Sequence, residues 1–248
     1  MNTGEILSLL KKGIPENAAI PFSGGLDSSV LLALSKGAAI TVGFPDSEDV
    51  RYAKRAFAFL SKGKHIVHFL DGREVKEALA ACKKLAPDFV KTEVLVPIWA
   101  VCKAAKENGF SRLAFGCGAE EIFIGYEKFF ECYEKVGEME FLKMQRTEIE
   151  AVKIGDCRLV EEVCGQFGLE ASFPYLNSRL IDDVLSIPLE ERLGSRRFKK
   201  LLLRHIARGL VPNFVLFRAK KAVQYGSGVH KVIVGLESRG SCCEFREL

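Results

Sequence analysis

Several features that would assign this chain to a common class of protein are absent from its 248 residues. No apolar run is long enough to span a membrane, and the segment Met1–Lys12 lacks the organisation of a signal peptide. The eight cysteines include no Cys-x-x-Cys pair, which argues against a zinc site, and a chain this long and apolar needs no disulfide scaffold. These absences predict a protein of the reducing cytoplasm with no membrane association.

The chain also lacks a strong charge of either sign. Its 36 basic and 32 acidic side chains give a formal net charge of +4, too small an excess to indicate nucleic-acid binding by itself. The densest basic clusters are residues 196–200 and 218–221, and the first is interpreted as a solvated helix face. Apolar residues make up 48% of the sequence, so we expect a folded protein with a large core and no nucleic-acid partner.

The most informative segment that is present is Pro21–Ser29. It follows the apolar residues 18–20 and precedes the apolar helical pattern 30–34, an order that predicts a strand, a glycine-rich turn and a helix. Two adjacent glycines permit a sharp turn and leave backbone amides open to a ligand, and the helix dipole favours an anion there. We expect this loop to bind the phosphates of a nucleotide through Ser23, Gly24, Gly25, Leu26, Asp27, Ser28 and Ser29.

This loop is not a Walker P-loop, because no Gly-Lys-Ser/Thr follows it. Asp27 would repel a phosphate by itself, but its carboxylate suits a Mg²⁺ ion held between it and the phosphates. The simpler alternative is a Gly-Gly turn with a serine N-cap. We favour binding because the loop occupies the first strand–helix turn of an α/β pattern.

The first half of the chain alternates strand and helix patterns. The expected strands are 38–44, 66–70 and 112–116, and the expected helices between them are 47–61, 73–84 and 94–107. This alternation predicts an α/β fold with a doubly wound, mostly parallel sheet and a site at the carboxyl ends of its strands. After Tyr126 helical patterns dominate, among them 128–153 and 195–208. We therefore expect residues 1–126 to form the α/β core and 127–248 a helical lobe of the same structural domain.

A second glycine-rich segment, residues 116–126, follows the last of these strands. Gly116 and Gly118 would allow a ligand to approach closely, and Glu120 would supply a second contact to Mg²⁺. The alternative is an ordinary helix start with acids in its first turn. Because the carboxyl ends of parallel strands meet at one edge of a sheet, this segment is expected to lie beside Pro21–Ser29.

These motifs resemble those of a known family. Ser23–Ser29, SGGLDSS, resembles the pyrophosphate-binding loop of the ATP pyrophosphatase superfamily, whose fold is adenine nucleotide α-hydrolase-like. Residues 116–126 resemble the GxGxDExFxGY motif of the C-terminal synthetase domain of asparagine synthetase. Residues 169–177 resemble the LEARVPFLD segment of the same family, and residues 198–204 resemble its KxxLR helix. Val211–Pro212 resembles a Leu-Pro pair that follows this helix, and Arg218–Lys220 resembles an R-x-K element. Together they cover about residues 15–230.

The resemblance implies an amide-forming ligase of amino-acid biosynthesis that uses ATP and Mg²⁺. Such an enzyme adenylates a carboxylate, releases pyrophosphate and passes the acyl group to ammonia or an amine, with AMP as the other product. It implies Lys220 as the catalytic lysine, with its neighbour Lys221 as the rival, and Glu170 as the group that orients the acyl group or the amine. The adenine is expected to rest against Val42, Gly43 and Phe44, all of which could equally be core residues.

The sequence departs from the asparagine synthetase pattern at several positions. Asn2 stands where the glutaminase half has its nucleophilic cysteine, so we expect no intrinsic glutaminase and a nitrogen supply from solution, from a separate glutaminase subunit or from another amine. Cys117 replaces a glutamate and Glu120 a metal-binding aspartate, while Ser172 replaces an arginine and Asn177 an aspartate. The small-molecule carboxylate that is the substrate therefore stays open, as does the oligomeric state.

Two other functions are alternatives. A tRNA-modifying ATP pyrophosphatase would need a basic surface or catalytic cysteines; the modest charge and the lack of Cys-x-x-Cys count against it, whereas Cys117 keeps it open. A non-catalytic nucleotide-binding subunit would have a damaged loop, and SGGLDSS is intact.

Overall fold

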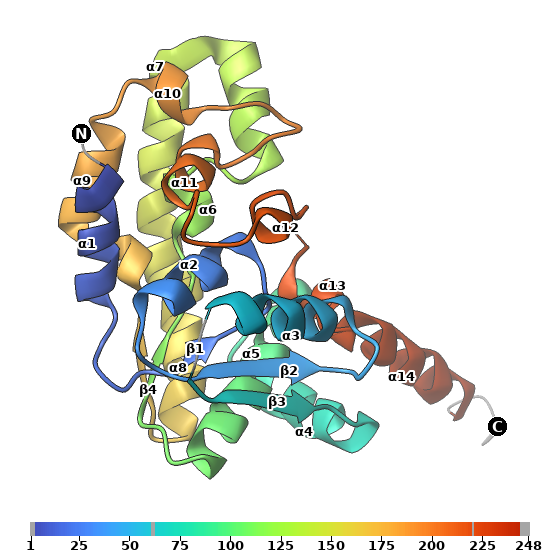
Figure 1. The fold of residues 1–248 in the computed structure, drawn as a ribbon. Helices are drawn as coiled ribbons and strands as arrows, with labels where there is room; N and C mark the ends of the chain where they lie inside the picture. The colour runs from blue at the N-terminus through green and yellow to red at the C-terminus, as the bar shows by residue number, and fades with distance from the viewer. Residues whose placement is uncertain (1–2, 61–62, 220, 244–248) are drawn as a thin grey trace.

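A parallel sheet forms the centre of the molecule (Figure 1). The computed structural model describes residues 3–60, 63–219 and 221–243. The strands are β1 (Ile20–Pro21), β2 (Ala39–Gly43), β3 (His65–Phe69), β4 (Arg112–Ala114) and β5 (Glu170–Ser172). β1, β2 and β3 pair in that order, β4 pairs with β5, and a parallel bridge between Ala19 and Leu113 joins the two groups. The strands therefore form one layer in the order β3-β2-β1-β4-β5.

Each face of this layer is covered by its own hydrophobic core. Successive residues of a strand point to opposite faces, so Ala39 belongs to one core and Ile40 to the other. Every residue of β2 is buried, as expected for a central strand of a parallel sheet that is covered on both sides. The expected α/β fold with a mostly parallel sheet is confirmed.

The helices on the face of the sheet to which Ala39 points carry the loops that form the candidate site. They are α1 (Thr3–Gly13), α2 (Leu26–Leu34), α3 (Glu48–Leu60), α9 (Ser178–Leu185), α11 (Leu201–Ile206) and α12 (Asn213–Leu216). The opposite face packs against α4 (Gly72–Cys82), α5 (Phe89–Glu107), α8 (Arg158–Gln166) and α14 (Val229–Cys243), with α13 (Val223–Gly226) contacting α5. Side-chain caps start several helices: Asp71 accepts from the Glu74 amide at 2.8 Å and Asp88 from the Lys91 amide at 2.8 Å.

The segment between β4 and β5 is mostly helical. It contains α6 (Ala119–Ile122), α7 (Glu127–Val152), a π-helical turn (Lys153–Cys157) and α8. The expected helix 128–153 is broken at Gly137, whose φ of 80° no continuous helix adopts. The projecting part of α7 packs with α10 (Leu189–Arg192) around Phe129, Phe141 and Leu189 (Figure 1).

Two elements differ from the expected ones. β5 has only three residues, too few to show the alternation of apolar and polar residues that indicates a strand. It pairs with β4 in the sheet, although it lies after Tyr126, where the α/β core was expected to end. The expected helix 195–208 starts only at Leu201, because Lys200, directly before it, has a left-handed backbone conformation with φ of 58°. Within the described residues, no helix combines the length and apolar character needed to cross a bilayer.

Candidate nucleotide-binding site

The turn between β1 and α2 has the geometry expected of an anion-binding loop. Gly24 has φ of 69°, and a Cβ there would lie 2.6 Å from the Ala53 nitrogen and from the Tyr52 carbonyl carbon, so α3 packs too closely for a side chain. No side chain caps the start of α2, and its first amides are available to a ligand. The Ser23 hydroxyl accepts a 3.3 Å hydrogen bond from the Gly25 amide.

This turn opens into a cavity of about 520 Å³. Other parts of its wall come from the segment 120–127 after β4, from Asp49 of α3, and from residues at and just before the start of α11. Arg218, Ala219, Lys221 and Ala222, which follow α12, also line it. The charged groups that line it include Asp27, Glu120, Lys200, Arg204 and Arg218. The cavity thus combines the amino end of a helix with cations and two convergent carboxylates.

Lys200 lies at the centre of this cluster and is only 5% exposed. Its Nζ donates to Asp27 Oδ1 at 2.7 Å, to Asp27 Oδ2 at 2.6 Å and to Glu120 Oε1 at 2.6 Å. Burial by itself lowers the pKa of Lys200, but the charges of both carboxylates and their hydrogen bonds outweigh burial and raise the pKa above its usual value. The lysine is therefore charged throughout the physiological range.

Gly125 makes room for this ion cluster. A Cβ at Gly125 would lie 1.7 Å from Glu120 Oε2 and 2.6 Å from Lys200 Cε. The adjacent Ile124 has a φ of 59°, and its carbonyl accepts the Lys200 amide at 3.3 Å. The backbone of the 120–127 loop therefore holds the start of α11 against it.

The two glycine-rich loops lie side by side, as expected from the sheet. A Cβ at Gly116 would lie 3.3 Å from the Cβ of Asp27. From a third segment, the fully buried Tyr175 donates its hydroxyl to the Asp27 carbonyl at 3.0 Å, and burial together with the Asp27 charge raises the pKa of Tyr175 well above its usual value. Asp27 is thus fixed through its backbone as well as its carboxylate.

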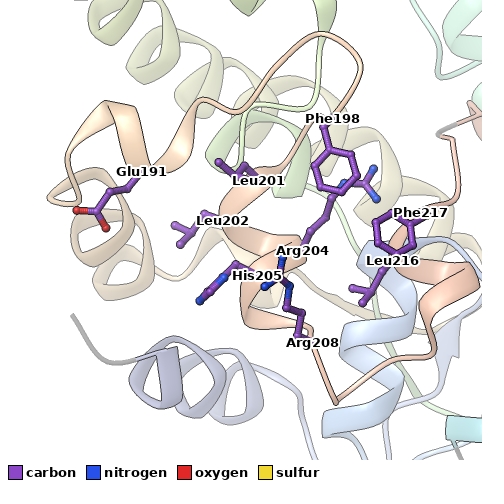
Figure 2. Close-up of a pocket in the computed structure, with 9 residues that line it drawn as sticks. All are labelled: Glu191, Phe198, Leu201, Leu202, Arg204, His205, Arg208, Leu216 and Phe217. Carbon is purple, nitrogen blue, oxygen red and sulfur yellow. The ribbon is translucent and has the colours of Figure 1, made fainter.

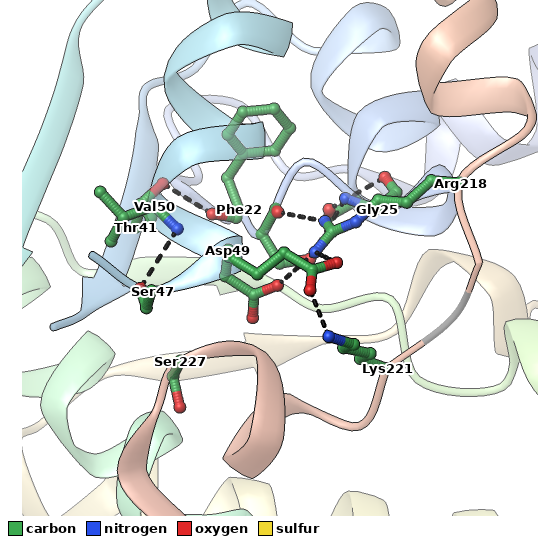
Figure 3. Close-up of polar contacts among 12 residues, drawn as sticks. Phe22, Gly25, Thr41, Ser47, Asp49, Val50, Arg218, Lys221 and Ser227 are labelled. Atoms are coloured by element: carbon green, nitrogen blue, oxygen red, sulfur yellow. Dashed lines mark hydrogen bonds and ion pairs between the residues drawn. The ribbon is translucent and has the colours of Figure 1, made fainter. Parts of the chain in front are cut away.

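Arg218 connects the loop to α3 (Figure 3). Its Nη1 donates to the Ser23 carbonyl at 2.7 Å, its Nη2 donates to Asp49 Oδ1 at 2.7 Å, and its guanidinium stacks 4.0 Å from the centre of the Tyr52 ring. Burial raises the pKa of Asp49 to about 6, although the hydrogen bond and charge of Arg218 oppose this shift. Close by, Lys221 forms an ion pair with Glu48.

Arg204 lines both this cavity and a second hollow of about 290 Å³, and Figure 2 shows the residues around the second hollow. Arg204 Nε donates to the Lys199 carbonyl at 2.6 Å, and burial lowers the pKa of Arg204. The hollow is mostly apolar, and Phe217 at its edge is 65% exposed. No paired carboxylates line it, so the polar chemistry lies on the Asp27 side of Arg204.

The predicted site residues fall into two groups. Those that line the cavity are Ser23, Gly25, Leu26, Asp27, Glu120 and Lys221. Those that shape its surroundings are Gly24, Ser28, Ser29, Gly116 and Gly118. Gly118 packs against a side chain, because a Cβ there would lie 2.4 Å from Leu176 Cδ2. Lys220 lies outside the described residues.

Two groups of predicted residues are not brought to the cavity wall. Val42, Gly43 and Phe44 lie at the carboxyl end of β2, where Phe44 donates its amide to the Ser227 carbonyl at 3.1 Å. Glu170 lies at the amino end of β5, the end of the strand away from the glycine-rich loops, with its side chain 74% exposed and 3.0 Å from Arg112 Nε. Their proposed roles in adenine and substrate binding stay predictions.

The structure adds residues that the sequence argument missed. The interpretation of 196–200 as a solvated face is wrong for Lys200, which is buried because two carboxylates from distant segments surround it. The likeness to the KxxLR helix was the available signal, since its lysine aligns with Lys200. Arg218, Gly125 and Tyr175 are the other additions.

The residues that depart from the asparagine synthetase pattern have local roles. Asn177 caps α9 by accepting the Leu180 amide at 3.2 Å, and the Ser172 hydroxyl donates to the Leu113 carbonyl at 3.2 Å. A hydrogen bond with Cys157, together with burial, raises the pKa of Cys117 well above its usual value. These three residues do not line the cavity, whereas Glu120, the fourth departure from the pattern, does.

Asp27 and Glu120 are the two carboxylates of the cavity that could hold a Mg²⁺ ion together. Their oxygens converge on one point, at which the Lys200 ammonium lies. Mg²⁺ in nucleotide sites is typically held by one or two carboxylates together with phosphate and water oxygens. No group of three or more metal-ligating side chains occurs among the described residues, so phosphate oxygens and water would complete the coordination.

Comparison with known proteins identifies relatives of this chain. The asparagine synthetase B (glutamine-hydrolysing) of Escherichia coli is 25% identical over 232 residues, which cover 84% of this chain and 40% of that protein. Asparagine synthetase (glutamine-hydrolysing) 2 of Oryza sativa subsp. japonica is 27% identical over 241 residues, covering 85% and 39%. The chain therefore spans less than half the length of these curated relatives.

Among solved structures, the U34-tRNA thiolase NcsA from Methanococcus maripaludis superposes with a TM-score of 0.46 at 15% identity, covering 95% of this chain and 73% of that one. A likeness at this level supports no statement about substrate or activity. The Asparagine synthase family profile matches residues 17–140 and 133–237, and these ranges include every segment of the cavity wall. The chain belongs to the asparagine synthase family.

Proposed function

We propose that this chain carries the ATP-dependent step of an amide-forming ligase. It adenylates a small-molecule carboxylate with release of pyrophosphate, and ammonia or an amine then displaces AMP from the acyl group. The observation that carries the proposal is the convergence of four features on one cavity: the uncapped start of α2, the Lys200 ammonium, and the carboxylates of Asp27 and Glu120. Family membership supports the same chemistry.

The described residues have distinct roles in this reaction. The amides at the start of α2 bind the pyrophosphate oxygens, because unpaired helix amides favour an anion. Lys200, a buried cation of the site, stabilises the negative charge that develops on the departing pyrophosphate. Arg218 holds the loop through the Ser23 carbonyl. Asp27 and Glu120 would hold Mg²⁺, which when bound neutralises phosphate charge.

The catalytic lysine of this proposal is Lys200 in place of Lys220. Lys200 contacts both candidate metal ligands, and it is the lysine that aligns with the KxxLR element. Lys221, the earlier rival, lines the cavity but is ion-paired with Glu48 at its rim. We therefore expect Lys221 to contribute less to turnover than Lys200.

The carboxylate substrate and the nitrogen donor remain broader proposals. We propose that nitrogen comes from free ammonia, an amine or a separate glutaminase subunit, in a cytoplasmic setting. A sulfur-transfer reaction is not proposed, because it needs a reactive thiolate. The Cys117 thiol is instead hydrogen-bonded to Cys157, with a raised pKa.

Product analysis tests this function. The purified protein is incubated with ATP, Mg²⁺, ammonium and a panel of carboxylates, and the nucleotides are separated by chromatography. AMP and pyrophosphate formed in a carboxylate-dependent manner would support the proposal, with Asp27→Asn as the inactive control. ADP as the main product would contradict it.

A further inference from the structure

The Lys200 ammonium occupies the point at which a metal ion would be held. Its Nζ lies 2.6 to 2.7 Å from the oxygens of Asp27 and Glu120, the two candidate Mg²⁺ ligands. Bound Mg²⁺ lies about 2.0–2.1 Å from its oxygen ligands. Both cations would therefore use the same oxygens from nearly the same position, and the two modes of binding exclude each other.

The surroundings of Lys200 allow its side chain to leave this point. The backbone is held by the hydrogen bond from its amide to the Ile124 carbonyl and by α11, which begins at the next residue. Only the flexible four-carbon stem has to move, and the cavity that it lines has a volume of about 520 Å³. The destination on the phosphate side is the space in front of the uncapped amides of α2.

We propose that Lys200 is a placeholder cation that holds the metal position until nucleotide binds. In the free protein its ammonium offsets one of the two negative charges of Asp27 and Glu120; when Mg²⁺ enters with ATP, the ion takes these oxygens and the ammonium moves to the phosphates. This inference rests on the proposed function for the identity of the ligand. The proposal predicts that Mg²⁺ alone binds weakly, because the ion must displace the Lys200 ammonium. It also predicts that Mg²⁺ and a polyphosphate each increase the protein's affinity for the other.

Replacing the lysine by an uncharged side chain of similar length tests the exchange. Lys200→Met removes the competing cation, so nucleotide-free protein should bind Mn²⁺, a spectroscopic substitute for Mg²⁺, more tightly. Hydrogen bonds to charged groups correspond to roughly ten- to hundred-fold in an equilibrium constant, and we expect a gain of that size by electron paramagnetic resonance titration. Affinity for pyrophosphate should fall in the same variant.

Lys199→Met is the matched control, because Lys199 is adjacent, lies 2.6 Å from Glu127 and does not touch Asp27. Its Mn²⁺ affinity should equal that of the wild type. Unchanged or weaker Mn²⁺ binding by folded Lys200→Met would overturn the proposal. A lysine with an ordinary catalytic role would reduce turnover without strengthening metal binding, so the sign of the change separates the two roles.

A second measurement uses the unmodified protein, in case the variant does not fold. Acylation of Lys200 by a succinimidyl ester, followed by mass spectrometry, should be slow in the free protein, faster at saturating Mg²⁺, and slow again when pyrophosphate is added. A rate that is the same in all three conditions would overturn the exchange. Neither test involves ATP turnover, so failure of the ligase proposal and failure of this inference are distinguishable.

Discussion

Gly125→Ala should damage the ion cluster without adding or removing a charged group. The new Cβ would lie 1.7 Å from Glu120 Oε2 and 2.6 Å from Lys200 Cε, so both side chains must move. Each is the flexible end of a side chain, but each is also held by the 2.6 Å contact between them. Breaking a buried ion pair of this kind costs on the order of 3–5 kcal/mol, and partial relaxation of Glu120 should bring the loss to about 3 kcal/mol.

The assay has two parts, and Gly165→Ala is its control. Gly165 lies within α8, and a Cβ there would meet no atom within 4 Å, so alanine should stabilise the protein by roughly 0.5–1 kcal/mol through helix propensity. Urea unfolding gives the free energy of unfolding of both variants, and pyrophosphate release gives their activity. If Gly125→Ala unfolded within about 0.5 kcal/mol of the wild type and kept full activity, the cluster would not be the centre of the site.

Three further changes test other parts of the structure. Burial raises the pKa of Asp49 from 3.8 to about 6, so the folded protein favours the protonated carboxyl. The resulting contribution to the free energy of unfolding, roughly 3 kcal/mol, is present below about pH 4 and is lost as the pH rises through 6. Asp49→Asn should remove this pH dependence from unfolding curves measured between pH 4 and 7. Arg218→Met removes the hydrogen bonds to the Ser23 carbonyl and to Asp49, and calorimetry should show pyrophosphate binding weakened at least about tenfold. The control is Arg208→Met, at an exposed arginine, which should bind pyrophosphate as the wild type does. Tyr175→Phe leaves the Asp27 carbonyl without its 3.0 Å partner and should cost about 1 kcal/mol of unfolding free energy; no measurable loss would mean that this bond does not hold the loop.

The parts of the site that local sequence and the parallel sheet specify were predicted, whereas the side-chain contacts between distant segments were not. The Gly24 turn and the uncapped start of α2 follow from a strand, two glycines and a helical pattern within a few residues. The burial of Lys200 could not be predicted in this way, because its partners Asp27 and Glu120 are 173 and 80 residues away in sequence. Propensity and periodicity describe neither the tertiary environment of one lysine nor a left-handed backbone at a residue other than glycine.

The position of Glu170, away from the cavity wall, has a different physical origin. The family motif indicated that residues 169–177 were near the substrate, but a three-residue strand has no detectable period that would show which of its ends meets the site. The parallel register Arg112 to Glu170 puts this residue at the amino end of the strand. The carboxyl end, with Ser172 hydrogen-bonded to Leu113, is the end nearer the loops.

The separation in sequence between the two halves of the site has a consequence for its assembly. Arg218 and Ser23 are 195 residues apart, and Lys200 and Asp27 are 173 apart, so during synthesis the glycine-rich loop is made well before the segments that hold it. Closing such long loops delays contact formation relative to local helices. Phosphate affinity should therefore be the last property to return on refolding, after the helical circular dichroism signal, and a chain stopped before residue 196 should retain an anion loop with an unpaired Asp27.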